Sequence, residues 1–172
     1  MATFHGPETK QFAATVPGEL LTYYASNGDA KLVGISIRFF AGPHPNGLLV
    51  LKSLPAGADK VFPYIMAIET GNQLCCSFGT EFHIQSTTPP AEIIYSENLK
   101  AGRILYTHDI PSMPVICCSH AQSTQFISME TWKTVGGPHV GKLTTQLPKW
   151  RVLKTTKLGG SFELEEFATF PA

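Results

Sequence analysis

The chain has 172 residues, which is enough for one domain with a sizeable hydrophobic core. Its 13 basic and 13 acidic residues balance to a formal net charge of zero, which argues against a domain that binds nucleic acid through bulk positive charge. The same neutrality leaves little repulsion between copies of the chain and therefore favours association.

The first third of the chain predicts strands joined by tight turns. Residues 1–10 are polar and predict an arm or an edge segment, and a strand is expected over residues 11–16, before Pro17-Gly18. Three more strands are expected over residues 20–24, 32–40 and 48–54. The middle one alternates apolar and polar residues, and Asn-Gly dipeptides stand in both connecting loops.

The remaining chain continues in short apolar segments. Strands are expected over residues 74–84, with a bulge or bend at Gly79, and over residues 103–108, 115–119, 124–133 and 150–153. Residues 61–69 are compatible with a strand or a short helix, and residues 93–95 with a short strand or a turn. The segments 85–102 and 134–149 are expected to be long connections.

These segments predict an all-β protein, because none has a helical repeat longer than two turns. Long connections between short strands favour a Greek-key jelly roll over an up-and-down barrel. We therefore expect an eight-stranded antiparallel β-sandwich of the jelly-roll type over residues 13–158. Residues 1–12 would form an N-terminal arm and residues 159–172 a C-terminal arm.

The four cysteines form two adjacent pairs, Cys75-Cys76 and Cys117-Cys118. Neighbours in a strand point to opposite faces, so neither pair is expected to share a metal ion or a disulfide. The absence of CxxC spacing also argues against a zinc site, and buried thiols in two central strands are expected. No secretory signal is expected, and no apolar stretch is long enough to span a membrane, so no membrane partner is predicted.

The histidines do not indicate an enzyme, because none has the HxH spacing of a cupin-type metal site. The neighbours His108-Asp109 and Cys118 to His120 have the wrong geometry for a nucleophile and its base. No catalytic residue, metal ligand or cofactor is therefore predicted. The glycine-rich segment 135–141 has no following Lys-Ser/Thr helix, and we expect a surface loop there rather than a phosphate-binding loop.

Two groups of side chains remain as candidates for binding. Trp132 and Trp150, with nearby tyrosines, could form a platform that stacks on a sugar, although aromatic residues in strands usually belong to a core or an interface. Basic residues are concentrated in the C-terminal third, where a solvated strand face is the usual explanation. The residues predicted to contact RNA are Lys149, Arg151, Lys154 and Lys157.

The early strands resemble those of a picornavirus-like jelly-roll coat protein, in particular the coat proteins of plant viruses of the secovirus group. The matching parts are Leu20–Tyr24, Gly28-Asp29, Leu32–Phe40, Pro45-Asn46-Gly47 and Leu48–Pro55, and Gly102–His108 resembles a later strand. The resemblance covers roughly the first 110 residues. The chain lacks the strongly basic arm that many simpler plant-virus coat proteins use to bind RNA.

This resemblance implies a structural subunit of an icosahedral, pseudo T=3 capsid that assembles with other jelly-roll coat proteins around an RNA genome. It implies a place in the virion, and in the host cytoplasm during assembly. Aromatic residues near both ends are predicted to contact neighbouring subunits: Phe4, Phe12, Phe162, Phe167 and Phe170. Two alternatives stay open, namely a cytosolic lectin-like binding module on the same sandwich and a small jelly-roll enzyme.

Overall fold

The computed structural model describes residues 8–27, 30–41, 44–54, 61–67, 73–94, 99–106, 114–137, 143–158 and 161–170. Within these residues the chain forms fifteen strands and a single 3-10 turn, η1 (Phe12–Ala14), with no α-helix. The strands are β1 (Glu8–Gln11), β2 (Leu20–Asn27), β3 (Ala30–Ala41), β4 (His44–Leu54), β5 (Tyr64–Ala67), β6 (Leu74–Ser77), β7 (His83–Ser86), β8 (Ala91–Ile94), β9 (Ile104–Tyr106), β10 (Val115–His120), β11 (Ser123–Ser128), β12 (Thr134–Val135), β13 (Leu143–Leu147), β14 (Trp150–Leu158) and β15 (Ser161–Phe170). The predicted all-β class is confirmed, whereas the described strands outnumber the expected eight.

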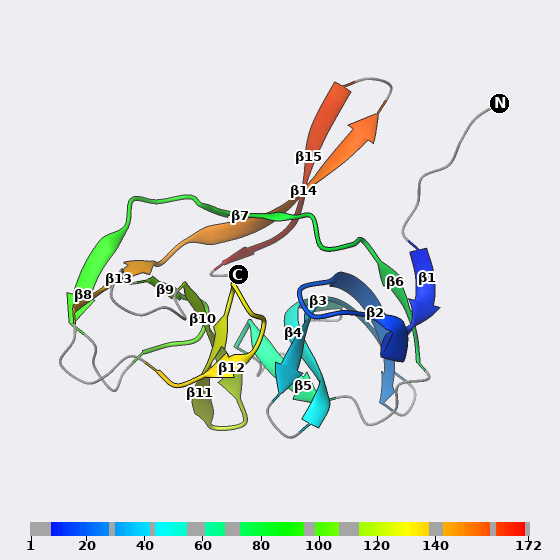
Figure 1. Cartoon of the computed structure of the whole chain (residues 1–172), viewed down its shortest axis with the longest axis horizontal. Coiled ribbons are helices and arrows are strands. Elements are labelled where there is room, and N and C mark those ends of the chain that lie inside the picture. The colour runs from blue at the N-terminus through cyan, green and yellow to red at the C-terminus, as the bar shows by residue number, and fades with distance from the viewer. Residues whose placement is uncertain are drawn as a thin grey trace.

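Twelve of these strands form one long sheet that has two halves. The first half runs β1-β6-β2-β3-β4-β5, and the second runs β10-β9-β13-β8, with β11 and β12 added beside β10. The halves meet where β5 and β10 pair in parallel, with Tyr64 opposite Ser119. Figure 1 shows the two halves side by side.

The first half is a meander from β2 to β5, after which β6 returns to pair with β2. A Greek key makes such a return after three strands, whereas β6 returns after the four strands β2 to β5. β1 then adds to the outer side of β6, with Glu8 opposite Ser77 and Gln11 opposite Leu74. Residues 8–11 of the expected N-terminal arm thus belong to a sheet, while residues 1–7 lie outside the described part.

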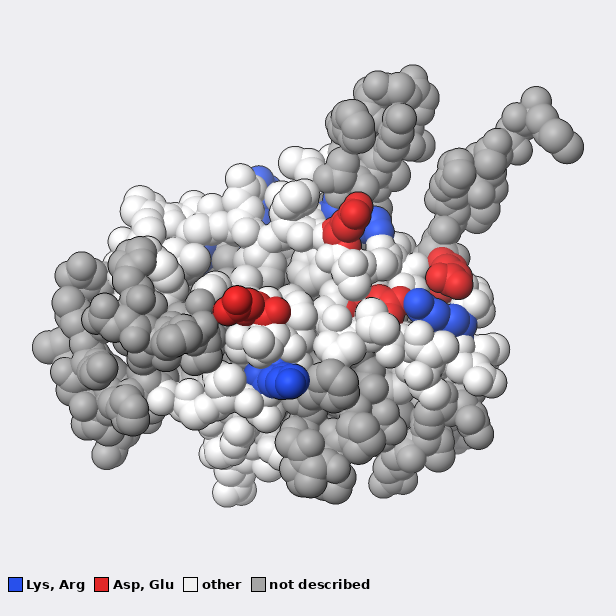
Figure 2. Space-filling view, viewed as in Figure 1, with Lys and Arg blue, Asp and Glu red and all other residues white. Residues whose placement is uncertain are grey.

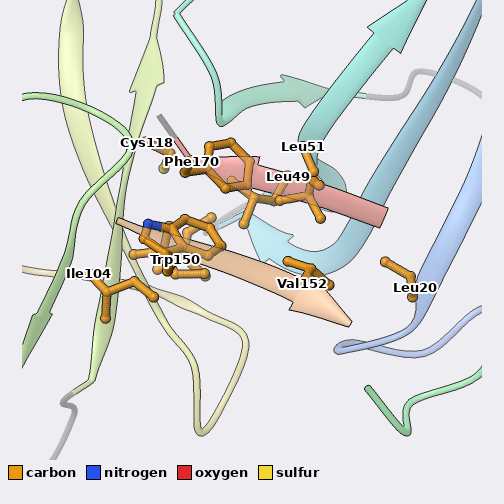
Figure 3. Close-up of a cluster of buried hydrophobic side chains, with 11 residues drawn as sticks. Leu20, Leu49, Leu51, Ile104, Cys118, Trp150, Val152 and Phe170 are labelled. Atoms are coloured by element: carbon orange, nitrogen blue, oxygen red, sulfur yellow. The ribbon is translucent and has the colours of Figure 1, made fainter. Parts of the chain in front are cut away.

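The remaining three strands form a separate C-terminal sheet, in the order β15-β14-β7. In Figure 1, β7 and β14 run across both halves of the long sheet. The largest hydrophobic core lies between these two layers (Figure 3). It combines buried residues of both halves with residues of the C-terminal sheet: Leu20, Leu49, Leu51, Ile104, Ile116, Cys118, Ile127, Trp150, Val152, Ala168 and Phe170.

Several strands of the long sheet are buried on both faces. Leu20 lies in the main core, whereas the next residue, Leu21, packs with Phe12 in a second cluster. In β10, Cys118 lies in the main core and Cys117 in a third cluster on the opposite face. Burial on both faces explains why these strands are almost continuously apolar. It also confirms that adjacent cysteines point to opposite faces.

The structure differs from the sequence-based expectation in the segment 11–16. A strand was expected there, but the Thr15 amide and hydroxyl both donate to the Phe12 carbonyl and close the 3-10 turn η1. This turn places Phe12 in the second cluster. Between residues 61 and 69, the strand β5 begins directly after Pro63, so the missing N–H of proline falls outside the ladder.

The two expected long connections also contain strands. β8 lies in the segment 85–102, β13 lies in the segment 134–149, and the two pair with each other in antiparallel fashion. β13 has the sequence LTTQL, whose three polar residues hide the apolar signal of a strand. Pairing between distant segments decided both elements, since neither has a strong local signal.

The expected C-terminal arm is the most consequential difference. Residues 161–170 form β15, which pairs with β14 from Trp150–Phe170 at one end to Leu158–Ser161 at the other. The register shifts between Val152 and Leu153 and passes over Phe167, as in a β-bulge. The segment is therefore a strand of this chain's own sheet, held by backbone hydrogen bonds and by the burial of Ala168 and Phe170.

Candidate functional site

The predicted binding residues gather on one hairpin, formed by β14 and β15. Lys149 directly precedes β14, which carries Arg151, Lys154 and Lys157, and β15 carries Phe162, Phe167 and Phe170. The fold thus brings the predicted RNA contacts and most predicted subunit contacts together. The side chains of Lys157, Phe162 and Phe167, and all of Phe4, lie outside the described part of the structure.

At the foot of the hairpin, aromatic side chains are buried in the chain's own core. The rings of Trp150 and Phe170 stack with their centroids 4.2 Å apart, and they are 0% and 1% exposed (Figure 3). The Trp150 Nε1–H donates to the Gly102 carbonyl at 2.9 Å. Phe12 is buried equally well, at 1% exposure, in the second cluster. Neither Phe170 nor Phe12 therefore presents a surface to a neighbouring subunit.

Arg151 is engaged within the chain. Its Nε and Nη2 donate to the Gln85 side-chain oxygen at 3.0 and 2.8 Å, and its Nη1 lies 3.3 Å from a Glu166 carboxylate oxygen. The Thr169 hydroxyl and the Arg151 guanidinium lower the pKa of Glu166. An arginine that already holds an amide and a carboxylate has few donors left for a phosphate group.

β15 offsets most of the basic charge on β14. It contributes Glu163, Glu165 and Glu166, and Glu165 stands opposite Lys154 in the register. On the face shown in Figure 2, acidic and basic side chains occur in small separate groups, and at the foot of the hairpin they lie side by side. The hairpin thus lacks the strong positive field that would bind nucleic acid by charge alone.

A pocket of about 310 Å³ lies between β7 and β14, lined by Glu81, Phe82, His83 and Lys154. The Lys154 Nζ lies over the Phe78 ring, 5.7 Å from its centroid, in a cation–π contact. The Phe82 ring in turn lies 5.9 Å from the Trp132 ring at an angle of 49°. One predicted residue, Lys154, is thus combined with aromatic and ionisable groups that the sequence did not connect with it.

The chain reaches this pocket through a break in the expected strand 74–84. Gly79 has a φ of +80°, in the region that favours glycine, and the chain there leaves β6 and enters β7 in the other sheet. Glu81, Phe82 and His83 consequently lie beside β14. Gly79 had been identified as a bend in the sequence, but nothing in the sequence indicated that the bend changes sheets.

The two tryptophans differ in their access to solvent. Trp150 is fully buried and is therefore excluded as a sugar platform. Trp132 is half-buried and packs against Gly18, where an added Cβ would lie 2.6 Å from the Trp132 Nε1. Only Trp132 can contribute to a surface near the pocket, through its contact with Phe82.

The thiols of Cys117 and Cys118 are buried, whereas two described histidines are exposed. No group of three or more potential metal ligands is found among the described residues. Burial raises the pKa of Cys117 to about 12 and also raises that of Cys118, so both stay protonated thiols at neutral pH. His83 and His120 are exposed.

A polar cluster holds the N-terminal edge of the long sheet, between β1, β6 and the residue before β2. The buried Glu19 carboxylate accepts hydrogen bonds from the Val16 amide at 2.7 Å and from the Ser77 hydroxyl. The Lys10 Nζ, on β1, lies 2.5 Å from a Glu19 oxygen. Burial alone would raise the pKa of Glu19, but the hydrogen bonds and the Lys10 charge outweigh it, so that the pKa is lowered.

None of the described residues belongs to a helix that is long and apolar enough to cross a bilayer. No family model, no curated protein and no solved structure matches the chain.

Proposed function

We propose that the chain is a structural subunit of an icosahedral, pseudo T=3 viral capsid of the picornavirus-like, secovirus type. In this proposal it assembles with other jelly-roll coat proteins around an RNA genome, in the virion and in the host cytoplasm during assembly. The subunit acts by forming contacts and carries out no chemical reaction. It needs neither cofactor nor metal ion.

The observation that carries this proposal is the open edge of β15, the outer strand of the β14–β15 hairpin. Among the described strands, β15 pairs only with β14, so its other edge offers the backbone donors and acceptors of about every second residue of this ten-residue strand. The tip of the hairpin stands away from the body of the molecule (Figure 1), and Leu164 near that tip is 62% exposed. A two-stranded hairpin is only marginally stable alone, and an open edge is a template for another strand.

Packing against a neighbouring subunit would cover both the open edge of β15 and the exposed Leu164. It adds partners to the β15 edge and removes Leu164 from water, and symmetry repeats the contact around a shell. The predicted subunit contacts Phe162 and Phe167 belong to the same strand. The zero formal net charge fits close packing of many copies.

The layered β-architecture supports the jelly-roll part of the proposal. A core between two sheets is a feature of that class, and the return from β5 to β6, beside the first strand of the meander, is related to its Greek-key connections. The meander from β2 to β5 keeps four successive strands in one sheet, which is a longer meander than the simple jelly roll requires.

The experiment is a measurement of particle state. The chain is expressed alone and with its co-encoded coat proteins, and sedimentation and negative-stain microscopy are applied to each preparation. We expect shells of uniform diameter from the complete set of coat proteins. Leu164→Ser should abolish them, whereas Val61→Ser, at a residue that is 59% exposed outside the hairpin, should not. A monomer under all conditions would overturn the proposal.

A lectin-like binding module is the second candidate. The half-buried Phe82–Trp132 pair beside Glu81 supports it, because sugars pack on aromatic faces while carboxylates accept hydrogen bonds from their hydroxyls. This candidate predicts a stable monomer or small oligomer that binds defined sugars on a glycan array. Binding there that is lost in Phe82→Leu would favour it over the capsid subunit.

A further inference from the structure

The pocket between β7 and β14 combines groups that suit a nucleotide. Lys154 supplies a cation, Phe82 an aromatic surface, His83 an imidazole and Glu81 a carboxylate. We propose that this pocket binds one nucleotide of single-stranded RNA, with the base against Phe82 and the phosphate at Lys154. This inference rests on the proposed function for the source of the RNA, which is the enclosed genome.

The size of the pocket limits its ligand. Its volume of about 310 Å³ is at the lower end of the range that small-molecule sites span, about 300 to 1,000 Å³. One nucleotide is of the right scale, whereas a base pair within a duplex is not. Single-stranded RNA, whose bases can leave the stack, can insert one base in such a pocket.

Lys154 differs from its neighbour Arg151 in what it contacts. Arg151 holds Gln85 and Glu166, whereas the Lys154 ammonium rests over the Phe78 ring and its side chain lines the pocket. A cation–π contact near the surface contributes only about 0.5 to 1 kcal/mol. A phosphate oxygen can therefore displace this contact and gain a charge-assisted hydrogen bond.

Phe82 is placed to stack on a base. Its ring is half-buried and is fixed on one side by the tilted contact with Trp132, so little side-chain freedom is lost when a ligand binds. Stacking of a base on an aromatic side chain is tolerant of sequence. The neighbouring Glu81 carboxylate accepts hydrogen bonds, which favours bases with an exocyclic amino group, cytosine above all.

The distribution of charge on the chain favours RNA binding by a local pocket over binding by an extended basic surface. The glutamates of β15 offset the basic residues of β14, and the whole chain carries no formal net charge. Binding by a single pocket is consequently weak in one subunit. Many copies of the subunit in one shell would each hold the same enclosed RNA molecule, so that the weak contacts act together.

The test measures binding of a fluorescein-labelled twelve-nucleotide oligocytidylate to the purified chain by fluorescence anisotropy at two salt concentrations. We expect Lys154→Gln and Phe82→Leu each to weaken binding about tenfold, since one stacked base or one phosphate contact is of that order. Lys100→Gln removes the same charge at an exposed residue outside the pocket and outside the hairpin, and should change the affinity by less than about twofold. Thermal unfolding of each variant verifies that it is folded.

Two further readouts separate this site from a merely charged surface. Lys154→Gln should reduce the slope of log affinity against log salt by about one. Trp132 is the tryptophan near the pocket, so its fluorescence should change on binding in Trp150→Phe, where it is the remaining tryptophan. Oligouridylate should bind more weakly than oligocytidylate.

Several results would overturn the inference. They are equal losses in Lys100→Gln and Lys154→Gln, equal affinity for duplex and single-stranded RNA, and displacement of the RNA by simple sugars. The particle assay is independent of this one. Shells that form without any dependence of RNA binding on Lys154 would refute the nucleotide site and keep the capsid proposal. Lys154-dependent binding by a chain that never assembles would refute the capsid proposal and keep the site.

Discussion

The foot and the tip of the β14–β15 hairpin belong to the same two strands but have opposite surroundings. At the foot, Trp150, Val152 and Phe170 are buried between the two sheets. At the tip, Leu164 is exposed, and the paired strands extend away from the body (Figure 1). The backbone ladder is continuous through both parts apart from the one register shift.

This contrast shows that strand pairing and core packing contribute separately to folding stability. The foot is held by apolar burial, which dominates folding stability. The tip continues the same ladder, and its described residue Leu164 is exposed and therefore available for contacts outside the chain. Substitutions at the foot should act on folding, and substitutions at the tip should act on assembly.

The largest effect is expected at the foot. Trp150→Ala removes the largest fully buried side chain, its stacking on Phe170 and its hydrogen bond to Gly102. A loss of about 3 to 5 kcal/mol in the free energy of unfolding is expected from a cavity of this kind. Urea unfolding monitored by circular dichroism measures it. A loss below about 1 kcal/mol would break the comparison, because the foot would then not be held by its core.

A second test concerns the N-terminal edge of the long sheet, where the buried Glu19 carboxylate pairs with Lys10. Glu19→Gln leaves the shape of the side chain but removes the charge that pairs with Lys10. We expect a loss of about 2 kcal/mol at pH 7, less than for a fully buried pair because Lys10 is partly exposed. Unfolding of both proteins between pH 3 and pH 7 is the measurement.

The sign of the pH effect follows from the lowered pKa of Glu19. Because the folded-state pKa lies below the ordinary value of 4.5, the carboxylate stabilises the fold above that value. The stabilisation disappears as the pH falls through the folded-state pKa. The wild type should therefore approach Glu19→Gln in stability below about pH 4.5, and a constant difference down to pH 3 would contradict the assignment.

A smaller effect is expected on the solvent-facing side of the foot. Arg151→Gln removes the hydrogen bonds to Gln85 and the ion pair with Glu166, both at the surface. Exposed pairs of this type contribute about 0 to 1 kcal/mol, and we expect a loss within that range. Denaturant unfolding at low and at 1 M salt should show the difference shrinking with salt. A difference that grows with salt would mean that the pair is not electrostatic in origin.

The smallest effect on folding is expected at the tip itself. Leu164→Ser exchanges an exposed leucine, so the free energy of unfolding of the isolated chain should change by less than about 0.5 kcal/mol. The same variant is the one expected to lose particle formation. A large loss of stability in the monomer would show that Leu164 packs within its own chain, and the contrast between foot and tip would then fail.

Part of the fold could be predicted from local pattern. Alternation and apolar runs located β2, β3, β4, β10 and β11, because a strand with a buried face must place apolar residues at regular intervals. The opposite orientation of Cys117 and Cys118 follows from the same geometry. The all-β class is the sum of these local features.

The candidate site could be predicted only one residue at a time. Lys154 stood out as a basic residue, but its partners Glu81, Phe82 and His83 lay in a segment interpreted as one continuous strand. Gly79 permits the chain to change sheets there, yet a glycine within a strand is equally compatible with a simple bulge. The sequence contains no signal that distinguishes these two outcomes.

What the sequence by itself determined is thus where strands form and which faces they bury. What only the tertiary structure decided is which strands pair: β8 with β13, β7 with β14, and β15 with β14 rather than with a neighbouring subunit. The physical reason is that backbone hydrogen bonds are the same for every residue. Pairing is chosen by packing between residues far apart in the chain, and no local pattern records that choice.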